Sequence, residues 1–128
     1  MEIPRNIIKR LFLFEYEYWK VKSLDEVRRR VSKEFQFLPV ESLVKVLEEI
    51  VGGIESLVKY SSEKALAIRS ARVKPPMVYF LIVEEHELGG KVFLIETIYS
   101  QYSYDKILAG MRAFSAYVGI KCKLIKQL

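Results

Sequence analysis

The sequence predicts one α+β domain, residues 1–128, built on an aromatic-rich antiparallel sheet. Aromatic residues alternate along the segment 9–20, which is a strand period. Two apolar, β-branched and aromatic runs, at 77–83 and 91–99, flank a polar turn with two glycines and so predict a hairpin. Apolar residues also recur at helical spacing elsewhere in the chain. With a hydrophobic fraction of 51%, the chain can fill one core without disulfides or a structural metal.

The strand predicted at 9–20 has two different faces. One face carries aromatic side chains: Phe12, Phe14, Tyr16 and Tyr18. The other face carries aliphatic and acidic side chains: Leu11, Leu13, Glu15 and Glu17. Aromatic residues on an open sheet face can stack bases, whereas on a helix-covered face they belong to the core. Because Glu15 and Glu17 favour water and repel phosphate, the core interpretation is favoured.

Two helices are predicted after this strand. Ser23 and Glu26 form a capping box that marks the start of the first helix. Its apolar stripe consists of Leu24, Val27, Val31 and Phe35. Pro39 suits the first turn of the second helix, and the glycine pair 52–53 weakens or ends it. The buried face of this second helix consists of Leu43, Val46, Leu47, Ile50 and Ile54. The stretch 54–60 is compatible with further helix, and 65–73 with either a third helix or a short edge strand.

The last part of the chain predicts a helix and a strand. The helix is capped near Ser103 and ends before Gly119. Its stripe consists of Ile107, Leu108, Met111, Phe114 and Val118. The strand covers 120–126. If the two earlier helices count as one crossover, the order is βαββαβ, the split βαβ of ferredoxin-like folds. We therefore expect a two-layer fold, with all helices on one face of a four-stranded antiparallel sheet and the other face open.

The composition bounds the compartment and the class of partner. The formal net charge of +5 and the pI of about 9.3 suit a polyanion partner. Cys122 is the only cysteine, which excludes an internal disulfide and fits a reducing, cytoplasmic compartment. The sequence has no apolar stretch near the roughly 20 residues that span a bilayer, so no membrane partner is expected. The scarcity of Asn and Gln hints at a thermophilic source.

The first group of candidate nucleic-acid-binding residues lies on the first predicted helix: Arg28, Arg29, Arg30 and Lys33. Guanidinium groups within one helical turn can hold phosphates. In the alternative interpretation they form ordinary surface ion pairs, since Asp25 and Glu26 precede Arg29 and Arg30 by four residues. The sequence favours ion pairs over phosphate binding, but both interpretations stay open.

The second group is Lys121 and Lys123, on the last predicted strand with Lys126 nearby. If the first and last strands pair, Lys20 and Lys22 lie near one end of this basic edge. Lysines at a sheet edge also protect it from aggregation. Phosphate binding and edge protection therefore both stay open.

The sequence contains few candidate catalytic or metal-binding motifs. It does not settle whether the protein is an enzyme, but it favours a protein without catalytic activity of its own. The acidic run around His86, residues 84–87, lies in a hairpin turn and is better explained as a solvated turn than as a metal site. A magnesium-dependent nuclease of the restriction type would need a lysine beside Glu96, which the segment 95–98 lacks. No glycine-rich phosphate loop is present. The sequence therefore predicts no catalytic residue, metal or cofactor.

Five segments carry a resemblance to a known family: Val78–Ile82, Lys91–Ile95, Ile107–Phe114, Ile120–Leu124 and the opening Lys9–Glu15. Together they resemble the ferredoxin-like Pop protein subunit of archaeal ribonuclease P, in which a hairpin precedes an Ala/Leu-rich helix and a basic strand. This chain has a longer connection between the first strand and the hairpin than that family. The resemblance implies an archaeal, non-catalytic RNA-binding subunit that works beside a partner protein.

Three functional hypotheses follow. The leading one is an accessory domain that binds nucleic acid, RNA before DNA, within a larger assembly. The alternative is a protein–protein interaction or homodimerisation module that uses the open sheet face. The third is a small nuclease of unrecognised type.

Overall fold

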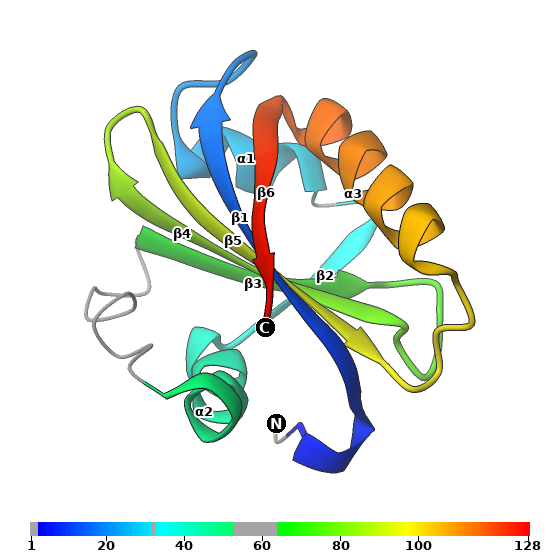
Figure 1. The fold of residues 1–128 in the computed structure, drawn as a ribbon. Coiled ribbons are helices and arrows are strands. Elements are labelled where there is room, and N and C mark those ends of the chain that lie inside the picture. The colour runs from blue at the N-terminus through cyan, green and yellow to red at the C-terminus, as the bar shows by residue number, and fades with distance from the viewer. Residues whose placement is uncertain (1–2, 32, 53–63) are drawn as a thin grey trace.

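The protein folds around one six-stranded antiparallel sheet. The structure is a computed structural model that describes residues 3–31, 33–52 and 64–128, and Figure 1 shows their arrangement. In chain order the elements are η1 (Arg5–Ile7), β1 (Ile8–Tyr18), α1 (Leu24–Val31), β2 (Phe35–Leu38), α2 (Val40–Val51), β3 (Ala65–Ser70), β4 (Val78–His86), β5 (Gly89–Thr97), α3 (Tyr104–Val118) and β6 (Ile120–Gln127). The strand order in the sheet is β2-β3-β4-β5-β1-β6.

The α+β class, the hairpin and the pairing of the first and last strands are confirmed. Strand β1 lies between β5 and β6, with Phe12 opposite Leu94 and Tyr16 opposite Cys122. The prediction of only four strands is wrong, because the sheet also contains β2 and β3. The ambiguous stretch 65–73 contains β3, which lies inside the sheet between β2 and β4 and is not an edge strand.

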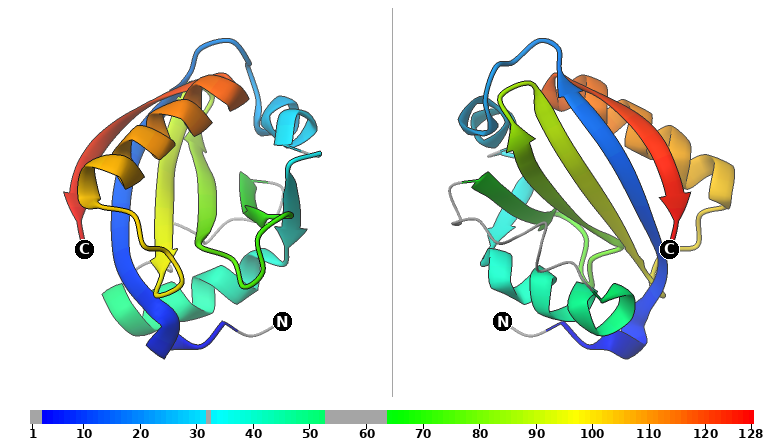
Figure 2. Two further views of the ribbon diagram at one scale, coloured as in Figure 1. Left: turned by 90° about the vertical axis from the view of Figure 1, so that its right-hand side faces the viewer. Right: turned by 60° about the vertical axis from the view of Figure 1, so that its left-hand side comes forward.

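The prediction that all helices pack on one face is also wrong. Helices α1 and α3 bury their apolar residues on one face with the β1 aromatics, whereas α2 buries Leu43 and Leu47 on the opposite face. Figures 1 and 2 show α3 and α2 on opposite sides of the strands. The physical reason is β2: it forms an edge strand between α1 and α2, so the chain passes from one face to the other there. The fold has three layers, and α2 covers part of the face expected to be open.

The β1 aromatics are core, as predicted. Phe12, Phe14 and Tyr16 are buried under α1 and α3. In the same cluster Phe80 and Phe114 stack with ring centroids 4.1 Å apart. Phe35, which was expected to end the first helical stripe, lies instead on β2, and its ring meets the Phe114 ring edge-on. Helix α1 ends at Val31.

The helix boundaries follow the predicted capping chemistry. The Ser23 hydroxyl accepts a hydrogen bond from the Glu26 backbone N–H at 3.3 Å, and the Glu26 carboxylate accepts one from the backbone N–H of Lys22 at 2.8 Å. Ser103 caps α3 through the backbone N–H of Lys106 at 3.2 Å. Gly52 ends α2. The expectations for Ile54 and the stretch 54–60 lie outside the described residues.

In the described ranges, no helix is both long and apolar enough to cross a bilayer.

Candidate nucleic-acid interface

The arginines of α1 do not form one phosphate clamp. Arg28 points towards β2: its guanidinium lies 3.9 Å from the Asp25 carboxylate and 5.6 Å from the centre of the Phe37 ring. Arg30 lies on the other side, where it donates to the backbone carbonyl of Tyr117 at 3.5 Å. The Tyr117 hydroxyl donates in return to the backbone carbonyl of Arg30 at 2.7 Å. Arg28 therefore lies beside β2 and Arg30 beside the end of α3, so the arginines do not converge on one phosphate.

The remaining two residues of the first group are exposed. Arg29 lies on the outer side of α1. Lys33 falls in the turn after α1, so its expected place on the helix is wrong. The helix ends before it because the chain turns there into β2.

The lysines of β6 face acidic residues across the strand pair. Lys123 is opposite Glu15 and Lys121 is opposite Glu17, and Glu15 is also opposite Lys91 on β5. Opposite charges in such cross-strand positions stabilise a sheet by about 0.2–1 kcal/mol. Lys123 therefore ends a charge ladder that runs across three strands as Lys123, Glu15 and Lys91, and this arrangement favours the structural role.

Lys121 also takes part in a second arrangement, around Trp19. Its ammonium lies 5.0 Å from the centre of the Trp19 ring, and the ammonium of Lys20 lies 4.5 Å from the same centre. Trp19 is 51% exposed and belongs to neither apolar cluster of the core. The predicted approach of Lys20 to the basic edge is confirmed, because β1 and β6 pair.

Gly119 brings Arg30 to the same place. The backbone N–H groups of Trp19 and Lys20 both donate to the Gly119 carbonyl, at 3.1 and 2.9 Å. Gly119 has a φ of 86°, and a Cβ on it would lie 3.2 Å from Lys20 Cβ and 3.3 Å from Arg30 Nη1. The positive φ favours glycine here, and a side chain would crowd the close approach of the β1–α1 connection, α1 and the end of α3. We call Trp19, Lys20, Arg30, Tyr117 and Lys121 the Trp19 cluster.

A shallow groove of about 350 Å³ between α3 and β6 continues from the cluster. Trp19, Arg112 and Lys121 line it together with apolar side chains that include Met111 and Ile120. The thiol of Cys122 also lines it. Burial raises the pKa of this thiol to about 11, so it is protonated at neutral pH and is a poor nucleophile. The groove offers apolar contacts with two cations at its rim.

The acidic residues 84–87, which we call the acidic hairpin, bound the cluster on the other side of β1, where the Tyr18 N–H donates to the Leu88 carbonyl. Residues 84–86 belong to strand β4, so the prediction that the whole acidic run lies in the turn is wrong. The side chains of the acidic hairpin have other partners: Glu84 accepts from the Tyr18 hydroxyl at 2.5 Å, and Glu85 pairs with Lys91 at 2.9 Å. The Nδ1 atom of His86 accepts from the backbone N–H of Leu88. In the described part of the chain, no three Asp, Glu, His or Cys side chains gather in a way that could hold a metal ion.

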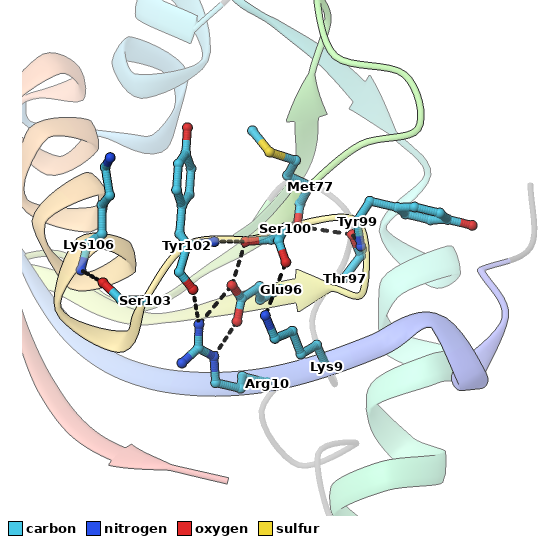
Figure 3. Close-up of polar contacts among 10 residues, drawn as sticks. All are labelled: Lys9, Arg10, Met77, Glu96, Thr97, Tyr99, Ser100, Tyr102, Ser103 and Lys106. Carbon is cyan, nitrogen blue, oxygen red and sulfur yellow. Dashed lines mark hydrogen bonds and ion pairs between the residues drawn. The ribbon is translucent and has the colours of Figure 1, made fainter.

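Glu96, the residue that a nuclease would use, lies at the opposite end of the sheet in a closed network (Figure 3). Its side chain is fully buried and forms a two-pronged ion pair with Arg10. It also accepts from the Ser100 hydroxyl at 2.6 Å. The rings of Tyr99 and Tyr102 point away from it (Figure 3).

The charge state of Glu96 follows from these contacts. Burial alone would raise the pKa of Glu96, but the hydrogen bonds from Arg10 and Ser100 outweigh it and hold the pKa below its usual value. The carboxylate is therefore ionised and its oxygens are occupied. A metal ion would have to break the Arg10 pair to reach it.

Comparison of the chain with protein-family models, curated proteins and solved structures gave no match. Function must therefore be inferred from the chemistry of these residues. An exposed lysine–aromatic contact is worth about 0.5–1 kcal/mol, whereas a base stacked on an aromatic ring is worth about 1–3 kcal/mol. A stacked base is therefore worth at least as much as the lysine contact that it would displace from an exposed aromatic ring.

Sequence reasoning found Arg30 and Lys121 but missed Trp19 and Tyr117. One signal for Trp19 was present: it is the only tryptophan, and it stands at the end of a strand directly before Lys20. The sequence does not show that Lys121, distant in the chain on β6, reaches the Trp19 ring, and the cluster depends on that contact.

Proposed function

We propose that this protein binds nucleic acid through the Trp19 cluster and acts as a non-catalytic accessory subunit of a larger assembly. One observation carries the proposal: Lys20 and Lys121, from different elements, converge on the exposed ring of Trp19, with Arg30 beside them. Exposed aromatic rings combined with cations are what sequence-tolerant nucleic-acid binding requires.

The charges around the cluster support this proposal. Among the ion pairs of the described residues, none involves Lys20, Arg30 or Lys121. Their charge is therefore available to a polyanion, whereas Arg10 and Lys91 are neutralised within the protein. The acidic hairpin directs a bound strand towards α1 and the α3–β6 groove, since it repels phosphate.

RNA is the preferred ligand in this proposal because of the resemblance to the Pop subunit of archaeal ribonuclease P. We further propose that β6, β1, β5 and β4, with α3 as a crossover, form a ferredoxin-like split βαβ core to which β2 and β3 are added. The adjacent, antiparallel order of these four strands supports this relationship.

Fluorescence anisotropy with labelled RNA and DNA, in single-stranded and structured forms, tests the proposal. We expect binding at about 50 mM salt that weakens steeply towards about 200 mM, because the three cations of the Trp19 cluster together with Arg112 give a slope near −3 in log K against log salt for a single strand. The variant Arg30→Ala should weaken binding, and Lys106→Ala, an exposed lysine stacked on Tyr102, should not.

The outcome that would contradict the proposal is an absence of affinity for every nucleic acid at low salt, for the protein alone and with its co-purified partners. A defined oligomer by light scattering, without salt-dependent binding, would favour the protein–protein alternative instead. The exposed ring of Phe37 on the edge strand β2 is the feature that favours this alternative. Nuclease activity lost in a folded Glu96→Gln variant would favour the third.

A further inference from the structure

We propose that the ligand of the Trp19 cluster is a single strand, with one unstacked base lying on the Trp19 ring and the flanking phosphates held by lysine and arginine. This inference rests on the proposed function and narrows it from nucleic acid in general to an unpaired segment. It assigns Trp19 the role of a stacking platform.

The position of Trp19 suits a platform. Its backbone is fixed by the hydrogen bond from its N–H to the Gly119 carbonyl. Its chain neighbourhood is anchored as well, because Tyr18 bonds to Glu84 and Val21 is buried. The indole itself is half exposed and lies outside both core clusters. A large apolar ring is thus presented on a rigid backbone without a packing role in the core.

The lysines on the ring can exchange places with a base. Each ammonium stands at the end of a flexible four-carbon stem, so it can leave the ring and still reach a phosphate next to the stacked base. The base gains the ring surface and the ammonium gains a phosphate.

The surroundings of the ring define a path for the strand. Lys20 and Arg30 lie towards α1, and Lys121 and Arg112 lie at the α3–β6 groove. Phosphates on either side of the stacked base therefore meet cations. The apolar lining of the groove suits a second base, as in modules whose aromatic residues stack two or three bases.

A duplex does not fit this arrangement. In a duplex the bases are already stacked on one another, and the deep major groove of A-form RNA excludes side chains. Trp19 would then contact only the sugar–phosphate surface.

Intrinsic fluorescence provides the test, because Trp19 is the only tryptophan in the chain. The protein is titrated with a single strand of about ten nucleotides, a length within known site sizes, and with the same sequence as a duplex. We expect the single strand to quench the fluorescence of Trp19. It should also bind at least about tenfold tighter than the duplex, because the duplex lacks one good stacking contact.

Variants separate stacking from charge. Trp19→Ala should lower single-strand affinity by about 5- to 150-fold, and Trp19→Phe should keep most of it. The matched control is Tyr99→Ala, an exposed aromatic at the other end of the sheet, which should leave affinity unchanged. Circular dichroism of each variant checks that the fold is intact.

The two failures can be told apart. If the duplex binds as tightly as the single strand, or if Trp19→Ala binds normally, the inference is overturned while the proposed function stands. If neither form binds at low salt, the proposed function fails and the inference with it. Single-stranded RNA and single-stranded DNA both support the inference, and their ratio reports whether the 2′-hydroxyl is contacted.

Discussion

The two ends of β1 use the same kinds of residue in opposite ways. At the end near Glu96, Arg10 forms an ion pair with this buried carboxylate, and its guanidinium also donates to the Tyr102 carbonyl at 2.8 Å. At the end near Trp19, the cations converge on an exposed ring and have no carboxylate partner within ion-pair distance among the described residues. The first end maintains the structure, whereas the second is available to a ligand.

This difference shows why a net charge of +5 is a weak guide to a binding surface. Three of the cations form ion pairs within the protein: Arg10 with Glu96, Arg28 with Asp25, and Lys91 with Glu85. What matters is which cations lie together and form no ion pair with a carboxylate. Four predictions test this difference between the two ends.

The largest effect is expected for Glu96→Gln. It leaves Arg10, whose side chain is only 19% exposed, without its counter-charge, and should lower the free energy of unfolding by about 3 kcal/mol. Urea denaturation measures the loss. Nucleic-acid affinity of the folded variant should not change.

Glu17→Gln is the matched control, since Glu17 is an exposed glutamate on β1. It should change stability by less than about 0.5 kcal/mol. Equal stabilities for the two variants would show that the Glu96 end is not a structural ion pair.

Acid should remove the Glu96 contribution in the wild-type protein. Because the folded pKa of Glu96 lies below its unfolded value, the stabilisation is complete above the unfolded pKa of about 4.5 and is lost as pH falls through the folded pKa. The stability difference between wild type and Glu96→Gln should therefore shrink below about pH 4.5. A difference that stays constant down to pH 2 would contradict the assignment.

Gly119→Ala should cost about 1–2 kcal/mol, because alanine is strained at a φ of 86° and its Cβ would crowd Lys20 and Arg30. Gly110 is the matched control: it lies inside α3 with open space around its Cβ position. Gly110→Ala should raise stability by up to about 1 kcal/mol. Thermal unfolding of both variants measures the two changes in stability. If both substitutions raised or both lowered the unfolding temperature, the prediction would be contradicted.

The smallest effect on stability is expected for the double variant Lys20→Ala, Lys121→Ala. Exposed cation–π contacts are weak, so the free energy of unfolding should change by less than about 1 kcal/mol. Binding should respond differently: the salt slope should become shallower by about 1.4, which is two phosphate contacts on a single strand. An unchanged slope would place phosphate contacts elsewhere on the surface.

Much of the fold could be predicted because periodicity is a local property. The alternation of Phe12, Phe14 and Tyr16 against Glu15 and Glu17 identified both the strand and its buried face. The caps at Ser23 and Ser103 and the glycine at 119 located helix ends. Strand β2 escaped because four residues place only two on each face, which cannot be distinguished from the tail of a helix.

The candidate site could be predicted only in part. Arg30 and Lys121 were found as basic residues on exposed positions, but so were Arg28 and Lys123, which the structure assigns to Asp25 and to the charge ladder with Glu15. The distinction between these pairs depends on which side of α1 meets α3 and on the register of β6 against β1.

The α+β class, the hairpin, the helix caps and the burial of the β1 aromatics could be predicted from the sequence, because each depends on spacing within one element. The placement of α2 opposite α1 and α3, and the meeting of Trp19, Arg30 and Lys121, follow from the packing of elements that are distant in the chain. Arg30 and Tyr117, which contact each other, are 87 residues apart in the chain. Such contacts depend on strand order and on the passage of β2 across the sheet edge, and neither leaves a periodic signal in the sequence.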